Sequence, residues 1–205
     1  MKIRVIILFF GLFLGVLLTT AYLASSQLRD NTIEYGRKVQ NPKKIMVTDL
    51  INSDDLQVSK NFFEGKWTMI TFGFTNCPDV CPTALASFRD EIKLLSEDEE
   101  KVQFVFVSVD PERDSPRRLK EYKNYFHKDI VAITGSEAEL RKFAKPFGVY
   151  FEKEEPTKEN DYAVSHSPQF FLISPEAELY AMYSPPLGRG KIAMDMSRLA
   201  QDTFL

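Results

Sequence analysis

Hydrophobic and polar positions divide the chain into parts of different character. The run from Val5 to Ala24 contains no charged residue, and the stretch from Gln27 to about Lys44 is polar and has no sustained periodicity. From Ile45 onward, short apolar segments alternate with segments whose apolar residues recur every three or four positions. These are the patterns of buried strands and of amphipathic helices. We therefore predict an N-terminal segment (1–26), a linker (27–44) and a folded domain (45–205).

The apolar segments of the domain predict a sheet. Trp67–Phe74 and Val102–Val109 are rich in β-branched and aromatic residues, as buried strands are. Ile130–Thr134 is a shorter strand of the same kind, and Gln169–Ile173 and Leu179–Tyr183 form a hairpin around a Ser-Pro-Glu turn. The turn composition of residues 52–55 predicts a small additional hairpin within residues 45–60.

Helical segments fill the intervals between these strands. In Pro82–Leu95 the apolar residues are three and four positions apart, and Pro82 suits the first helical position, which would put Cys81 at the helix cap. A second helix follows Asp114-Ser115-Pro116, and Ser136 with Glu139 predicts a capping box for a third. The residues from Lys191 to about Leu199 are weakly helical, and those from 152 to 161 suggest a charged loop or protruding hairpin.

Strands that alternate with helices predict an α/β sheet with right-handed crossovers. A thiol pair after the first core strand and a hairpin near the end of the chain match a thioredoxin-like arrangement. The fold expected is therefore a thioredoxin-like α/β domain with an N-terminal hairpin extension, preceded by one transmembrane helix.

The chemistry of the chain centres on Cys77 and Cys81, which are its two cysteines. They lie four positions apart, between a strand and a helix, where the helix dipole favours a reactive thiolate. A structural disulfide across so short a loop would add little stability. A reversible disulfide, a soft-metal site, or both remain open at this point.

A metal site needs further ligands, and the chain has two histidines. His127 lies among charged residues at a predicted helix end, as a surface residue would. His166 comes directly before the strand Gln169–Ile173, and in a thioredoxin-like fold that segment passes beside the thiol-bearing loop. Two thiolates and one imidazole favour copper or another soft ion. Structural zinc takes four protein ligands, so a zinc site here would need a carboxylate in addition to these three residues.

Two acidic residues near the cysteine pair can each be interpreted in two ways. Asp110 ends the central strand at the functional edge of the sheet, where it either orients the metal site or caps a turn. Asp79, between the cysteines, has the same two readings. The methionines Met182, Met194 and Met196 suit packing better than ligation.

The N-terminal run would serve as a membrane helix. Its 20 residues would span a hydrocarbon core of about 30 Å, and Lys2 and Arg4 before it place the domain on the outer face of the membrane. A cleaved signal peptide is the alternative, since Ala24-Ser25-Ser26 offers a small-residue site. Disulfides are permitted on that side in either case. The net charge of -3 gives no basic surface for nucleic acid.

Three motifs resemble the Sco/SenC copper-chaperone family. They are Gly73-Phe74-Thr75-Asn76-Cys77-Pro78-Asp79-Val80-Cys81-Pro82, Val109-Asp110-Pro111-Glu112-Arg113-Asp114, and Asp161-Tyr162 with His166. The resemblance covers about Ile45 to Leu199. Asn76 departs from the histidine common at that position in the family, which is not one of the usual ligands.

The resemblance implies copper bound by Cys77, Cys81 and His166, and a role in maturing the CuA centre of cytochrome c oxidase. One partner that the resemblance implies is the CuA-bearing oxidase subunit. Another is a thiol reductant or a second periplasmic copper carrier. The domain would contact these partners on the outer side of the cytoplasmic membrane. The alternative is a thiol-disulfide oxidoreductase that keeps the client's cysteines reduced, with Cys77 and Cys81 as a redox-active disulfide. A thioredoxin-superfamily peroxidase is a weaker alternative, because it gives no reason for His166.

Overall fold

The computed structural model describes residues 11, 13–20, 33–95, 100–155, 162–165 and 168–203. The chain forms two compact units, Met1–Thr32 and Ile33–Leu205. In the first unit, residues 13–20 are helical. No helix in the described part of the chain is long and apolar enough to cross a membrane. Most of the run from Val5 to Ala24, on which the membrane prediction depends, lies outside the described residues.

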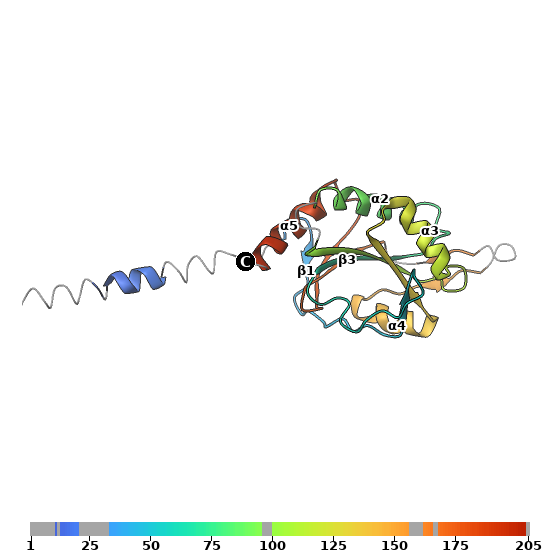
Figure 1. The fold of residues 1–205 in the computed structure, drawn as a ribbon, viewed down its shortest axis with the longest axis horizontal. Helices are drawn as coiled ribbons and strands as arrows, with labels where there is room; N and C mark the ends of the chain where they lie inside the picture. Colours follow the sequence, from blue (N-terminus) through green and yellow to red (C-terminus); the bar gives the residue numbers. More distant parts are fainter. Residues whose placement is uncertain are drawn as a thin grey trace, which may run out of the picture. The chain divides into compact units, whose positions relative to one another are not determined.

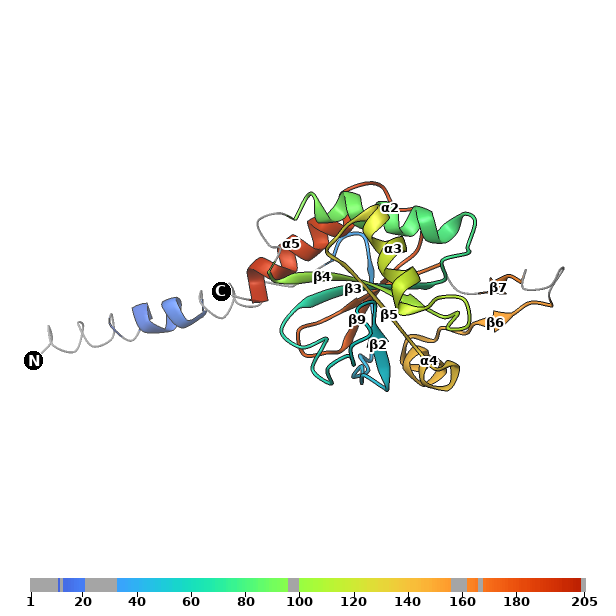
Figure 2. The same ribbon diagram turned by 45° about the vertical axis from the view of Figure 1, so that its right-hand side comes forward.

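The second unit is a sheet with helices on both faces (Figures 1 and 2). Its strands are β1 (Arg37–Lys38), β2 (Leu50–Asn52), β3 (Trp67–Gly73), β4 (Val102–Ser108), β5 (Ile130–Gly135), β6 (Glu152–Lys153), β7 (Val164–Ser165), β8 (Phe170–Ile173) and β9 (Leu179–Tyr183). Its helices are α2 (Val80–Ile92), α3 (Pro116–Phe126), α4 (Glu137–Ala144) and α5 (Lys191–Thr203), with a 3-10 turn at Lys145–Phe147. The predicted alternation of strands and helices is confirmed.

The main sheet has seven strands in the order β1-β9-β8-β3-β4-β5-β2. β3, β4 and β5 are parallel, and β8, β9, β1 and β2 pair antiparallel with their neighbours. Helices α2, α3 and α5 lie on one face and α4 on the other (Figure 2). Every residue of β3 is buried, as its β-branched and aromatic sequence predicts, and Thr68 and Thr71 are buried with the apolar residues. β6 and β7 form a separate two-stranded hairpin that projects from the domain.

Several boundaries differ from those that the sequence predicts. α2 begins at Val80 with Asp79 as its N-cap, so Cys81 lies inside the first turn and not at the cap. Proline is tolerated throughout that turn because its missing N–H has no helical partner there. α5 continues to Thr203, beyond the predicted end. The small N-terminal hairpin is reduced to one bridge between Ile51 and Gln57, and β2 pairs with β5 instead.

The predicted linker extends too far into the domain. From Ile33 the chain belongs to the folded unit, and β1 pairs with β9 at the edge of the sheet. The buried carboxylate of Asp195 on α5 accepts hydrogen bonds from the backbone N–H groups of Glu34, Tyr35 and Gly36, at 2.8, 3.0 and 3.3 Å. These contacts are long-range, so the polar composition of the segment could not reveal them.

A second buried carboxylate fixes the beginning of α5. Glu91 on α2 accepts hydrogen bonds from the backbone N–H groups of Gly190 and Ala193, both at 2.7 Å. The first N–H groups of a helix have no partner within the helix, so a carboxylate is stabilising there. Burial nevertheless raises the pKa of Glu91 above its ordinary value, against those two hydrogen bonds.

Candidate metal centre

The two cysteines lie at the carboxyl end of the central strand β3. Cys77 is in the turn after β3 and Cys81 is the second residue of α2. Both thiols are free and buried, and Cys77 adds to the rise in pKa that burial causes at the Cys81 thiol. The backbone N–H of Cys77 donates to the carbonyl oxygen of Phe74 at 3.2 Å, which closes the turn. The sequence therefore folds into a tight strand-to-helix turn that holds both sulfur atoms together.

Gly73 makes room for the sulfur of Cys81. A Cβ atom at Gly73 would lie 2.5 Å from the Sγ atom of Cys81 and 2.8 Å from Cε2 of Phe106. Real Cβ atoms do not approach other atoms so closely, and a glycine in a strand often marks such a close approach. The end of β3 is thus shaped around the thiol.

Burial also determines the acidity of the thiol pair. Desolvation raises the pKa of the Cys81 thiol well above its ordinary value, and a hydrogen bond with the Phe74 backbone only partly opposes this. Burial therefore opposes the thiolate that the position at the start of a helix predicts for Cys81. A metal ion would have to displace the thiol proton in order to bind there.

The carboxylate of Asp114 anchors the turn that precedes the cysteines. It is buried and accepts hydrogen bonds from the Thr75 backbone N–H at 2.9 Å, from the Thr75 hydroxyl at 2.5 Å and from the Ser108 hydroxyl at 2.6 Å. Burial raises the pKa of Asp114, and the bonds from Ser108 and Thr75 oppose the shift. The end of β3 is thereby joined to the end of β4.

Arg118 on α3 extends this network to Asn76, directly before Cys77. Its Nε atom donates to the Thr75 hydroxyl at 2.7 Å, and its Nη2 atom donates to the Asn76 side-chain oxygen. Asn76 is therefore held in place despite its departure from histidine. The sequence predicts Asp114 only as part of a helix opening, and it offers no signal for the roles of Thr75 and Arg118, because these contacts join residues about 40 positions apart.

Asp110 has a different set of partners. Its side chain is fully buried and forms a salt bridge with Nε of Arg113. The hydroxyl of Tyr162 donates to Oδ1 of Asp110 at 2.7 Å, and Nη1 of Arg113 donates to the Tyr162 carbonyl oxygen at 2.9 Å. The guanidinium carbon of Arg113 lies 3.6 Å from the centre of the Tyr162 ring. Asp110 therefore fixes the chain just before β7 to the end of β4.

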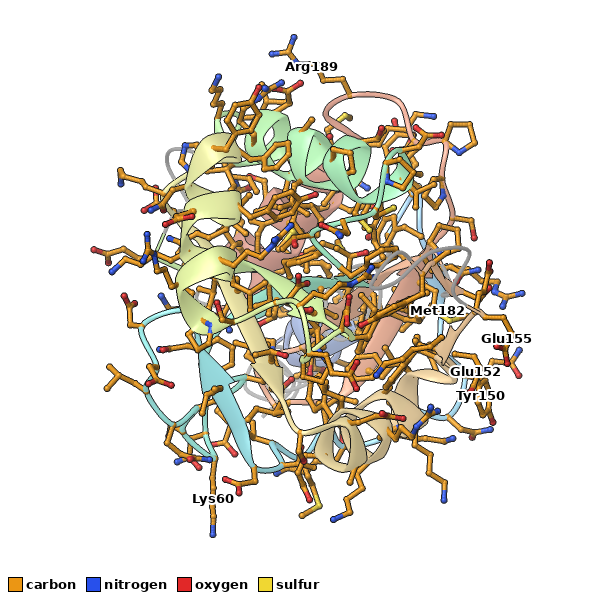
Figure 3. All side chains as sticks on the ribbon, turned by 90° about the vertical axis from the view of Figure 1, so that its right-hand side faces the viewer. Lys60, Tyr150, Glu152, Glu155, Met182 and Arg189 are labelled. Carbon is orange, nitrogen blue, oxygen red and sulfur yellow. The ribbon has the colours of Figure 1, made fainter. Side chains whose placement is uncertain are left out.

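A further contact fixes the projecting hairpin. Lys153 on β6 forms a salt bridge of 2.5 Å with Glu112 and lies over the Tyr162 ring at 5.6 Å from its centre. Figure 3 shows Tyr150, Glu152 and Glu155 pointing outward on the side of the molecule where the hairpin lies. The base of the hairpin is thus held to the motif that contains Asp110, and Glu152 also forms a salt bridge of 3.4 Å with Arg141 on α4.

The predicted ligand His166 lies outside the described residues, together with Ser167. Its described neighbours are close to the thiol loop: Pro168 lines the same hollow, of about 200 Å³, as Asp79 and Val80 between the cysteines. The main-chain oxygen of Gln169 accepts a hydrogen bond from Thr71 on β3 at 3.2 Å. Within the described ranges, no group of three or more His, Cys, Asp or Glu residues could hold a metal ion.

The remaining candidates have ordinary structural positions. His127 caps the end of α3, and its Nδ1 atom accepts a hydrogen bond from the Asp129 N–H at 3.3 Å. Asp79 is exposed at the N-cap of α2 and makes no side-chain capping hydrogen bond. Met196 is in the core, Met182 packs against the core and Met194 is half exposed.

The SCO1/SenC family model matches residues 39–201 of this chain. The chain belongs to the SCO1/SenC family. The match includes the cysteine pair, Asp110 and His166, so the resemblance seen in the three motifs is confirmed at the level of the family.

Curated relatives agree with this membership. "Protein SCO1 homolog 1, mitochondrial" of Arabidopsis thaliana is 39% identical over 135 residues, which are 65% of this chain and 40% of that protein. A protein of Stutzerimonas stutzeri, whose name describes it as copper-binding, is 36% identical over 140 residues, 68% of each chain. The chain thus matches less than half of the first relative and about two thirds of the second.

Solved structures share the fold. The crystal structure of Arabidopsis thaliana ScoI with copper bound has a TM-score of 0.68 and 31% identity, covering 83% of this chain and 99% of that one. A structure of BsSco, described as a member of the Sco family of cytochrome c oxidase assembly proteins with a disulfide switch, has a TM-score of 0.60 and 25% identity over 82% and 99% of the chains. The predicted thioredoxin-like α/β fold is confirmed.

Proposed function

We propose that this chain is a copper chaperone that binds one copper ion through Cys77, Cys81 and His166. The observation that carries the proposal is the pair of buried, reduced thiols held together at the end of β3. Thiolate and imidazole ligands suit copper, and a site with three protein ligands leaves the ion accessible for transfer.

Contacts around the hairpin support His166 as the third ligand. The bonds from Tyr162 and Arg113 to Asp110 hold the chain four residues before His166. Pro168, two residues after it, lines the hollow beside the turn between the cysteines. In this proposal Asp110 acts by orienting the segment that carries the imidazole.

The family relatives support copper as the cargo. The Arabidopsis ScoI structure contains bound copper, and the Stutzerimonas relative is named for copper binding. BsSco is described as belonging to cytochrome c oxidase assembly proteins. We accordingly propose the CuA-bearing subunit of a terminal oxidase as the client, with another copper carrier or a thiol reductant acting before it.

The proposed cellular arrangement is a single N-terminal membrane helix with the domain on the outer face. Its support is the uncharged run from Val5 to Ala24, preceded by Lys2 and Arg4. Mass spectrometry of the membrane-extracted protein should find residues 1–26 attached. A mature form that begins near Gln27 would instead identify a cleaved signal peptide.

Copper titration of the reduced full chain in detergent tests the ligand set. Competition with a chromophoric copper(I) chelator should give one site per chain. Cys77→Ala, Cys81→Ala and His166→Ala should each weaken binding by more than about 100-fold, since even outer-shell changes cost ~10–100-fold. His127→Ala is the matched control and should bind as the wild type does. Undiminished affinity in His166→Ala would rule out this coordination.

A second candidate function is thiol-disulfide exchange that keeps the client's cysteines reduced. It is favoured by the position of two free thiols four residues apart, one in the turn after β3 and the other in the first turn of α2. Oxidation consumes both thiolate ligands, so the oxidised chain should bind copper far more weakly than the reduced one. If the reduced and the fully oxidised chain bound copper equally tightly, the thiolates would not be copper ligands. Thiol-disulfide exchange would then be a function separate from copper binding.

A deletion strain distinguishes the two functions at the level of the client. Loss of a copper carrier should lower CuA-type oxidase activity, and added copper should partly restore it. The Cys77→Ala chain should fail to rescue. Normal CuA spectra in the deletion strain under copper limitation would argue against copper delivery and favour thiol-disulfide exchange as the main function.

A further inference from the structure

A hollow of about 470 Å³ lies at the edge of the sheet that is remote from the thiols. The thiols follow the carboxyl end of β3, whereas this hollow is lined by residues 102–104 and 130–131, at the amino ends of β4 and β5. Since β3, β4 and β5 are parallel, their amino ends share one edge of the sheet and their carboxyl ends the other. The hollow is therefore separate from the site proposed for copper.

Part of its lining is apolar. Ile92 at the end of α2, Phe62 in the loop before β3 and Val131 on β5 line the hollow and are only partly buried. Apolar surface is thus left in contact with water, which a ligand could cover. The volume is in the range of small-molecule sites, which hold about 300–1,000 Å³.

Another part of the lining is charged, and its two carboxylates already have cationic partners. Asp54 forms a salt bridge of 2.7 Å with Lys120, and Asp129 forms one of 2.8 Å with Lys128. These carboxylates therefore do not make the hollow a site for a cation.

Lys66 and Lys123 also line the hollow, and neither forms an ion pair with a described residue. Lys66 makes no side-chain hydrogen bond within the described ranges, and the Lys123 ammonium group donates to the carbonyl oxygen of Lys128. An ammonium group has three donors, so two remain at Lys123. Burial lowers the pKa of Lys123, because it penalises the charged form. An anion beside these two ammonium groups would favour their charge.

We propose that this hollow binds a small organic anion, whose negative group lies between the ammonium groups of Lys66 and Lys123. The apolar body of the ligand covers Phe62, Ile92 and Val131. The apolar part of the lining alone would accept a neutral compound, and the lysines alone would accept an inorganic anion. A ligand that combines the two properties uses both parts. The proposal does not depend on copper binding.

The probe for the test is 2-naphthoate, titrated into the full chain in detergent and followed by the amide resonances of the chain. It should shift the amides of Val102, Gln103 and Ile130, which line the hollow, and leave that of Cys77 in place. Two comparison compounds separate the parts of the lining. The neutral 2-naphthamide and inorganic phosphate should each bind at least about 10-fold more weakly than 2-naphthoate, since one lacks the charge and the other the apolar body.

Variants test the two lysines. Lys66→Gln and Lys123→Gln should each weaken 2-naphthoate binding by about 5-fold, the loss of one partly exposed ion pair, and leave 2-naphthamide binding unchanged. The matched control is Lys60→Gln, because Lys60 is exposed, does not line the hollow and extends away from the molecule (Figure 3). Amide spectra of the unliganded variants verify that each keeps the fold.

Several outcomes would overturn the proposal. If 2-naphthamide or phosphate bound as tightly as 2-naphthoate, one part of the lining would contribute nothing. Absence of 2-naphthoate binding, shifts confined to residues outside the hollow, or unchanged affinity in either lysine variant would also contradict it. A wild-type chain that binds no copper would overturn the proposed function and leave this inference standing, so the two fail separately.

Discussion

The hydroxyl of Tyr162 donates a hydrogen bond of 2.7 Å to Oδ1 of Asp110, across 52 positions of sequence. Asp110 is fully buried just after β4, and Tyr162 lies two residues before the short strand β7. Burial and the bond to Asp110 raise the pKa of Tyr162, so its hydroxyl remains a donor. This one contact connects the motif at the end of β4 to the segment that carries the proposed imidazole ligand.

Replacing Tyr162 with Phe should loosen that segment without unfolding the domain. The variant loses the hydrogen bond to Asp110, worth about 1.5–3 kcal/mol, and a longer contact of 3.3 Å with the Glu112 carboxylate. Hydrogen exchange at the Val164 and Ser165 amides should become faster, and copper affinity should fall by several-fold. Tyr150→Phe, at an exposed position directly before β6, is the control and should change neither. Unchanged exchange in Tyr162→Phe would show that Arg113 and the pairing of β6 with β7 fix the segment without the tyrosine hydroxyl.

Replacing Gly73 with Ala should disturb the thiol pair directly. The new Cβ would lie 2.5 Å from the Cys81 sulfur, and neither that sulfur nor the Phe106 ring can move freely in the core. Overpacking of this kind costs about 1–3 kcal/mol, which urea unfolding would measure. Copper affinity should also fall. The control is Gly188→Ala, whose nearest contacts are with the flexible end of Lys191. A Gly73→Ala protein of wild-type stability would contradict the close approach.

Replacing Asp195 with Asn should release the segment that leads into the domain. Asp195 accepts three backbone hydrogen bonds from residues 34–36 and one from the Tyr183 hydroxyl at 3.0 Å. Loss of the charge should lower the free energy of unfolding by about 2–3 kcal/mol and speed hydrogen exchange at those amides. Asp202→Asn, exposed on the same helix, provides the control. Slow exchange at residues 34–36 in Asp195→Asn would show that β1 pairing alone holds them.

Glu91 should give the domain a measurable dependence on pH. Burial raises its pKa in the folded state above the unfolded value of about 4.3, so the folded protein binds the proton more tightly. The stability contributed by this shift is fully present below the unfolded pKa and is lost as pH rises through the folded pKa. Urea unfolding of wild type and Glu91→Gln from pH 4 to 7 should show the wild type losing stability relative to the variant as pH rises. If the wild type instead gained stability relative to Glu91→Gln as pH rises, the hydrogen bonds from Gly190 and Ala193 would have a larger effect on the Glu91 pKa than burial.

The sequence by itself determined the order of the elements and the location of the chemistry. Dense β-branched and aromatic residues identify β3 and β4, because a strand covered on both faces needs apolar residues on each of them. Helical spacing and caps identify α3 and α4, where Ser115 and Ser136 accept the hydrogen bonds expected of them. The cysteine pair and its motif indicated both the family and the thiol site, since these signals depend on residues that are close along the chain.

Only the tertiary structure decided which distant residues support that site. Asp110 pairs with Tyr162, Asp114 holds Thr75, and Asp195 captures the chain at residues 34–36. Burial, which also depends on tertiary packing, opposes the acidity expected for Cys81 from its helix position. Each of these effects depends on groups separated by tens of residues or more and on the removal of water around them. Local propensity and periodicity contain no information on either.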